Sequence, residues 1–195
     1  MTEMKELEKT CFVFPRVDLE LEDIPQEGMI LDVAGGGEGV IGKLMSENVV
    51  AIDYQAEELL EAAEGPLKII MDARELKFLD ESFHVVTAFF AFMYIKSEED
   101  QLKVFQEIHR VLKPGGVIHI WDIDIFELPK TDKDVYILHL LYKIRGESKE
   151  TGYGMSKLEK PRGLQYYLDM AKKAGLKEKH SELIDHTFYS QLVKV

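Results

Sequence analysis

The feature that most constrains the fold is an apolar run that ends in an acid and a cluster of glycines, ILDVAGGGEG at residues 30–39. The apolar run predicts a buried strand, and glycines without β-carbons let the backbone of the following turn approach a ligand. A second apolar run ends at Asp53, 21 positions after Asp32. In a βαβ unit this spacing places the Asp53 carboxylate beside the glycine turn, where it can accept hydrogen bonds from ribose hydroxyls. The segment predicts a site for a nucleoside-bearing cofactor, although Asp53 alone also suits a helix cap.

Strand and helix patterns alternate along most of the chain, which is typical of an α/β protein. The repeated βα units predict a doubly wound, mostly parallel Rossmann-like sheet with helices on both faces and an antiparallel final strand. Proline and glycine at residues 114–116 are expected to end the longest helix. The expected strands are 29–33, 49–53, 67–71, 84–90 and 117–122, the expected helices are 39–48, 55–63, 98–112 and 162–174, and residues 183–195 hold a closing pair of strands.

We expect a single domain over residues 1–195, with an insertion at about 126–160. Within the insertion, DVYILHLLYKIR at residues 134–145 is rich in β-branched and aromatic residues and precedes a charged turn. This pattern favours a β-hairpin, and a helix over 135–144 is the alternative. The apolar side chains must be buried away from water, so the hairpin is expected to extend the sheet edge or to form a homodimer interface through residues 134–158. The first ten or so residues are expected to lack structure.

Composition narrows the class of protein and its partners. Thirty-six acidic and 24 basic side chains give a net charge of −12, so nucleic acid and anionic membranes are repelled. The single cysteine, Cys11, excludes an internal disulfide, and the first ten residues lack the apolar core of a signal peptide. No apolar run approaches the roughly 18 residues of a membrane span. The His and Cys positions lack the spacing of metal ligands. We therefore expect a cytoplasmic protein with no metal, nucleic-acid or membrane partner.

Two further segments carry a resemblance to a known family. MDARELKFLDESFHVVTAFFAFMYI at residues 71–95 and HRVLKPGG at 109–116 resemble the methyltransferase 11 type of class I S-adenosylmethionine-dependent methyltransferases, and the resemblance covers about residues 29–122. The family has glycine where Ala34 stands. Either Ala34 is tolerated and Glu38 takes the place of the third glycine, or one residue is inserted and Gly35, Gly37 and Gly39 serve instead. The resemblance implies cofactor contacts at Ala34, Gly35, Gly36, Gly37, Asp53, Tyr54, Asp72, Ala73 and Phe90.

The resemblance implies transfer of a methyl group from S-adenosylmethionine to a small-molecule acceptor by in-line displacement. Such a reaction needs a general base only if the acceptor holds its proton at neutral pH. The catalytic candidates are Tyr94, Asp122 and Tyr153; Asp122 is expected to be a solvated loop carboxylate, and Gly152–Gly154 to bend toward the acceptor. Two alternatives remain open from the sequence: a non-catalytic cofactor-binding or dimer scaffold module, and, more remotely, a nicotinamide-dependent oxidoreductase, since residues 37–42 match G-x-G-x-x-G.

Overall fold

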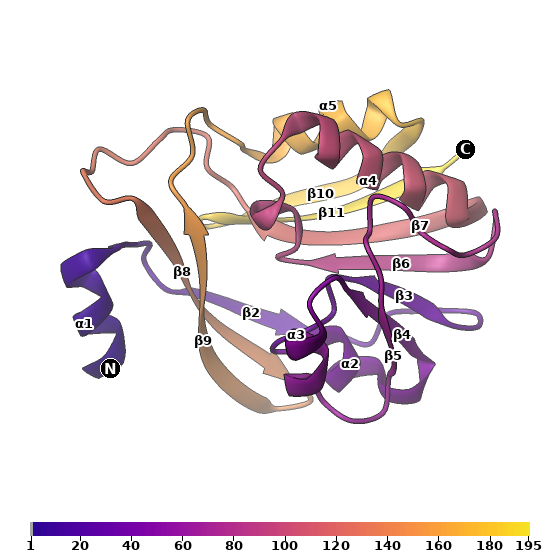
Figure 1. Cartoon of the computed structure of the whole chain (residues 1–195), viewed down its shortest axis with the longest axis horizontal. Helices are drawn as coiled ribbons and strands as arrows, with labels where there is room; N and C mark the ends of the chain where they lie inside the picture. The colour runs from indigo at the N-terminus through magenta and orange to yellow at the C-terminus, as the bar shows by residue number, and fades with distance from the viewer. Residues whose placement is uncertain (1) are drawn as a thin grey trace.

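The computed structural model describes residues 2–195, and its larger sheet has seven strands in the order β10-β11-β7-β6-β3-β4-β5 (Figure 1). The five strands from β7 to β5 are parallel, whereas β11 is antiparallel to both β7 and β10. This topology confirms the predicted doubly wound sheet with an antiparallel final strand. The strands are β3 (Ile30–Val33), β4 (Val49–Asp53), β5 (Leu67–Ile70), β6 (Phe83–Phe89), β7 (Leu112–Ile123), β10 (Leu176–Ile184) and β11 (Thr187–Lys194).

Helices cover both faces of this sheet (Figure 1). On one face α2 (Val40–Met45) and α3 (Ala56–Glu61) pack with one core cluster, and on the other α4 (Glu98–Val111) and α5 (Leu164–Lys173) pack with a second. Helix α4 begins where the Ser97 hydroxyl accepts a hydrogen bond from the Asp100 amide at 3.0 Å, which satisfies one free donor of the first turn. Two 3₁₀ turns, η1 (Ser46–Asn48) and η2 (Phe92–Tyr94), complete these connections. Among residues 2–195, no helix is both long and apolar enough to cross a membrane.

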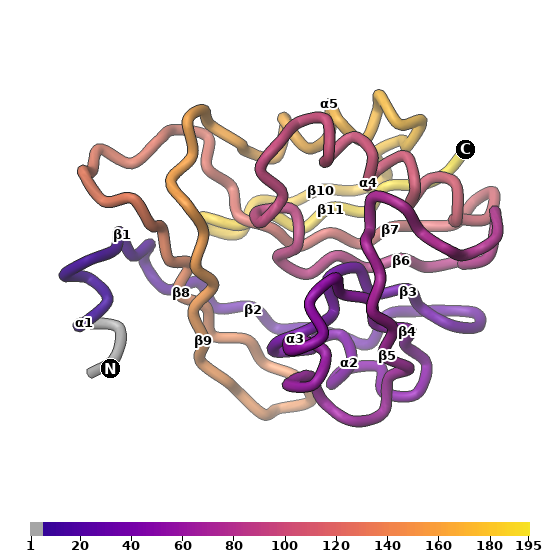
Figure 2. The backbone as a smooth tube through the Cα atoms, in the orientation of Figure 1, coloured from indigo at the N-terminus to yellow at the C-terminus, as the bar shows by residue number. Residues whose placement is uncertain are grey.

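The insertion folds as the predicted hairpin, β8 (Val135–Ile144) and β9 (Glu147–Ser156), so the helix alternative is wrong. The turn is Arg145–Gly146, with φ of 50° and 87°. Positive φ at both residues of a two-residue loop is the geometry that matches the twist of a hairpin. Figure 2 shows the two strands curving side by side, with the turn beside α2.

The expectation that the hairpin extends the larger sheet is wrong. It forms a separate sheet with β1 (Phe12–Val13) and β2 (Val17–Leu21), which both run parallel to β8 along the edge that β9 leaves free. Strand β2 alternates buried and exposed side chains, and its buried face joins the inward side chains of β8 in the core cluster beneath the larger sheet. The inward apolar side chains of the hairpin are therefore buried against other segments of the same chain.

Two further expectations need correction. Residues Thr2–Thr10 form a helix, α1, where we expected no structure. The closing strand pair begins at Leu176 and not at residue 183. Its first strand, β10, lies at the edge of the larger sheet. The side chains of residues 177–180 on that strand are exposed and mostly charged, so they lack the apolar alternation by which a strand is recognised.

Candidate active site

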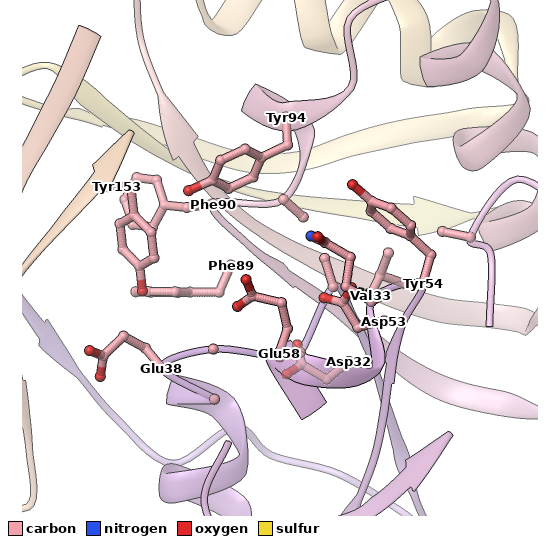
Figure 3. A pocket seen from close by; sticks show the side chains of 18 of the residues that line it. Asp32, Val33, Glu38, Asp53, Tyr54, Glu58, Phe89, Phe90, Tyr94 and Tyr153 are labelled. Atoms are coloured by element: carbon pink, nitrogen blue, oxygen red, sulfur yellow. Dashed lines mark hydrogen bonds between the residues drawn. The ribbon is translucent and has the colours of Figure 1, made fainter. Parts of the chain in front are cut away.

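A pocket of about 950 Å³ lies at the carboxyl ends of β3, β4 and β6, the edge where ligands bind open α/β sheets (Figure 3). Its volume is near the upper end of the range of about 300–1,000 Å³ that is typical of small-molecule and cofactor sites. The pocket wall includes every position expected to contact the cofactor: Ala34, Gly35, Gly36, Gly37, Asp53, Tyr54, Asp72, Ala73 and Phe90. Of the three catalytic candidates, Tyr94 and Tyr153 line the pocket and Asp122 does not.

The glycine turn joins β3 to α2, and positive φ angles occur at residues from both alignments left open by the sequence. Ala34 itself adopts a left-handed conformation with φ of 55°, a region of backbone angles that favours glycine. Glu38 stands between Gly37 and Gly39, whose φ angles are 56° and 53°. A β-carbon on Gly36 would lie 2.6 Å from the Glu58 β-carbon on α3, so the turn also packs closely against that helix. Ala34 thus adopts a conformation that favours glycine, and the alignment of this turn with the family's glycines stays a prediction.

Two buried aspartates stand at the ends of β3 and β4. Asp32 accepts a hydrogen bond from the Thr87 hydroxyl at 2.7 Å, and burial raises the pKa of its carboxyl to about 7 despite this bond. Asp53 is 8% exposed, and its Oδ1 accepts the backbone amide of Gln55 at 2.9 Å. Among residues 2–195 no group donates to its Oδ2. Asp53 therefore supports the start of α3 with one oxygen and has the other available to a ligand.

Asp72 follows β5 at the pocket wall. Arg74 donates to its carboxylate from Nη2 at 2.6 Å and from the backbone amide at 2.9 Å, and the side-chain bond lowers the pKa of Asp72. Arg74 also reaches Asp100 at 3.3 Å, at the start of α4. The Asp72 carboxylate is therefore fixed in place by protein contacts, while Ala73 beside it also lines the pocket.

Aromatic side chains form the opposite wall of the pocket. Phe90 directly follows β6 and has a φ of 50°, a strained conformation that a non-glycine residue keeps only where the surroundings enforce it. Its ring stacks on Tyr153 of β9 with centroids 5.3 Å apart and planes at 20°, and Tyr94 of η2 lies near both (Figure 3). Burial is the main reason that the pKa of both tyrosines rises above the ordinary value. Both hydroxyls thus remain protonated at neutral pH.

Asp122 is buried, so the expectation of a solvated loop carboxylate is wrong. Its carboxylate accepts the backbone amides of Phe92 at 2.8 Å, Met93 at 3.3 Å and Ile123 at 2.8 Å, and burial raises its pKa to about 7. The first two of these amides belong to η2, which carries Tyr94. Asp122 lies behind this turn and holds it in position.

Sequence analysis missed a polar cluster around Glu38. Glu38 Oε2 accepts hydrogen bonds from Lys43 at 2.9 Å, Lys149 at 2.8 Å and the Tyr142 hydroxyl at 2.9 Å, and Oε1 accepts the Thr151 hydroxyl at 3.3 Å. Partial burial opposes ionisation, but these bonds lower the pKa of Glu38 to about 2. Two strands of the hairpin are thereby tied to the glycine turn. An acid inside a glycine turn was the signal available in the sequence.

Comparison with known proteins identifies the family. A family model described as a methyltransferase domain matches residues 31–120. The demethylmenaquinone methyltransferase of Chlorobaculum parvum is 31% identical, over 87% of this chain and 73% of that protein. The chain belongs to the S-adenosylmethionine-dependent methyltransferases. A Legionella pneumophila ubiquinone/menaquinone biosynthesis C-methyltransferase is 30% identical, over 68% of this chain and 58% of that protein.

Solved methyltransferase structures share the fold. One from Methanosarcina mazei superposes with a TM-score of 0.66 at 14% identity, over 91% of this chain and 99% of that chain. Another from Mesorhizobium loti has a TM-score of 0.62 at 16% identity, over 87% and 93% of the two chains. The predicted fold class and cofactor are confirmed, and membership of this family replaces the nicotinamide-dependent alternative.

The residues of this methyltransferase fit S-adenosylmethionine. The available Oδ2 of Asp53 suits a ribose hydroxyl, and the glycine turn has no side chains at three consecutive positions, 35–37, that line the pocket. Asp32 and Glu58 add carboxyl groups to the same side of the pocket, which suits a ligand that carries a positive sulfonium. Bound S-adenosylmethionine supplies an activated methyl group, and the protein supplies the side chains and backbone that line the pocket around it.

The Glu38 cluster predicts a pH-dependent contribution to stability. Because the pKa of Glu38 is about 2 in the folded chain and 4.5 ordinarily, its contribution is present above pH 4.5 and is lost as the pH falls toward 2. We expect Glu38→Gln to lower the free energy of unfolding by about 1.5–3 kcal/mol at pH 7, the scale of a hydrogen bond to a charged group, and by less at about pH 3. Urea unfolding at both pH values measures this. The exposed Glu64→Gln is the control, and a loss at Glu38 that is equal at both pH values would contradict the assignment.

Proposed function

We propose that this methyltransferase acts on a small acceptor with a flat, apolar ring, which packs against the rings of Tyr94 and Tyr153, with the buried Phe90 supporting Tyr153 from behind. The observation that carries the proposal is the stacked pair of Phe90 and Tyr153, 5.3 Å apart, on the side of the pocket away from Asp53 (Figure 3). Aromatic side chains bind flat rings through stacking and edge contacts that are stronger than their buried area alone provides. The names of two relatives, which specify quinones or their precursors, agree with an acceptor of this shape.

The chain's own part in the reaction is to orient the acceptor and exclude water. Alignment and desolvation can supply most of the acceleration when the methyl group is already activated. Tyr94 and Tyr153 keep their protons at neutral pH, so they can donate hydrogen bonds to an acceptor oxygen but cannot serve as general bases. Asp122 acts on the reaction by holding η2, and with it Tyr94, in place.

Transfer of a labelled methyl group tests this proposal. The protein is incubated with methyl-labelled S-adenosylmethionine and either a hydroxynaphthalene or its saturated ring analogue. We expect label in the flat acceptor, and at least a tenfold lower kcat/KM in Tyr153→Leu with unchanged cofactor affinity, since the stacked ring is lost.

Tyr189→Leu is the matched control, because Tyr189 is also half-buried but lies on β11, outside this pocket. Equal labelling of the saturated analogue, or an unchanged kcat/KM in Tyr153→Leu, would contradict a flat acceptor.

A further inference from the structure

The two sides of the pocket carry opposite charge. Asp53 and Glu58 place carboxylates on the side that fits the cofactor, whereas Lys43 and Lys149 line the side near Tyr153. Figure 3 shows Asp32 and Asp53 at one side of the pocket, Glu38 and Tyr153 at the other, and Glu58 between them. In a chain with a net charge of −12, a wall that attracts anions is unexpected.

The lysine side of the pocket has a net positive charge even after its internal ion pairs form. Lys43 and Lys149 carry two positive charges, and the one carboxylate between them, Glu38, carries a single negative charge. A lysine ammonium has three N–H donors. Among the described residues, Lys149 donates to Glu38 alone, and its side chain is 54% exposed. Two of its donors therefore face solvent at the pocket wall.

Strand β9 arranges the charge and the aromatic ring in one row. Every second residue of this part of β9 points to the same face of the strand, and these residues are Lys149, Thr151 and Tyr153. All three line the pocket. Four residues of strand place the Cα atoms of Lys149 and Tyr153 roughly 13 Å apart. The flexible lysine side chain shortens this separation. A ligand whose ring packs on Tyr153 can thus reach the ammonium group with a substituent on that ring.

We propose that the methyl acceptor carries an anionic oxygen group, a carboxylate or a phosphate, which Lys149 binds with the help of Lys43. The inference rests on the proposed function, because the ring of the same acceptor must lie against Tyr153. Glu38 is the positioning residue of this subsite: it holds both ammonium groups at 2.8–2.9 Å, and its low pKa keeps it ionised at neutral pH.

Binding of matched aromatic probes tests the anion subsite. Affinities of 2-naphthoate, 2-naphthyl phosphate and the neutral 2-naphthamide are measured by calorimetry in the presence of S-adenosylhomocysteine. We expect at least one anion to bind about fivefold or more tightly than the amide, and the better of the two identifies the group. The preference should disappear in Lys149→Gln and persist in Lys149→Arg. It should also persist in the control Lys143→Gln, which removes a lysine of the same hairpin that pairs with Glu20 of β2.

The outcomes separate this inference from the proposed function. If the amide binds as tightly as both anions, or if Lys149→Gln keeps the preference, the anion subsite is wrong while the flat acceptor stands. If none of the three probes binds to a protein that still binds S-adenosylhomocysteine, both the anion subsite and the flat acceptor are wrong. Loss of the preference at high salt would accompany a true ion-pair contact, since salt screens exposed charges.

Discussion

Asp53→Ala is expected to weaken S-adenosylmethionine binding at least tenfold. The Asp53 carboxylate is buried at the end of β4, and its Oδ2 is available to a ribose hydroxyl. Hydrogen bonds from neutral donors to a charged acceptor contribute about 1.5–3 kcal/mol each, and 1.4 kcal/mol corresponds to a factor of ten in affinity. Calorimetry on the folded variant measures the loss, and unchanged affinity would contradict the ribose contact.

Two variants separate the ribose contact from the support that Asp53 gives to α3. Asp53→Asn keeps an oxygen for the Gln55 amide but loses the charge, so it should retain wild-type stability and still bind the cofactor more weakly. Asp169→Ala, at an exposed position on α5, should leave both properties unchanged. If Asp53→Ala and Asp53→Asn lost stability and affinity in proportion, Asp53 would be a helix cap and nothing more.

The cofactor side of the pocket could be predicted because its residues follow local patterns. Asp53 and Phe90 come directly after apolar runs, and parallel strands bring their carboxyl ends to one edge whatever the details of packing. The glycine turn was recognisable because it also follows an apolar run directly in the sequence. Its alignment with the family's glycines was not, because it depends on backbone angles such as the positive φ of Ala34, which the sequence does not contain.

The acceptor side depends on contacts between distant segments, which a local pattern does not contain. Val17 pairs with Leu140, and Glu38 bonds Lys149, across separations of more than 100 residues. Short strands such as β2 gain their stability from such pairing, so their own sequence carries a weak signal. The prediction that Asp122 is solvated failed for a related reason. Its hydrogen-bond partners are backbone amides, which nearly every residue type has, so no residue type in the sequence indicates them.

Leu140→Ala is expected to lower the free energy of unfolding by about 2–5 kcal/mol, the usual cost of a cavity in a core. Leu140 is fully buried between the two sheets, with 0% exposure, and lies opposite Val17 in the register of β8 and β2. Its neighbour Leu141 points to the other face of β8 and is only half-buried. Leu141→Ala is therefore the matched control, with an expected loss of about 1 kcal/mol or less.

The same measurement tests how the hairpin is covered. If the small sheet packs within its own chain, the loss at Leu140 should far exceed the loss at Leu141, and the urea midpoint should not change with protein concentration. A homodimer through residues 134–158 stays a prediction that this experiment also addresses, because unfolding coupled to dissociation makes the midpoint rise with concentration. Equal losses at Leu140 and Leu141, together with such a rise, would mean that the outer face of β8 is also buried, against a second copy of the chain.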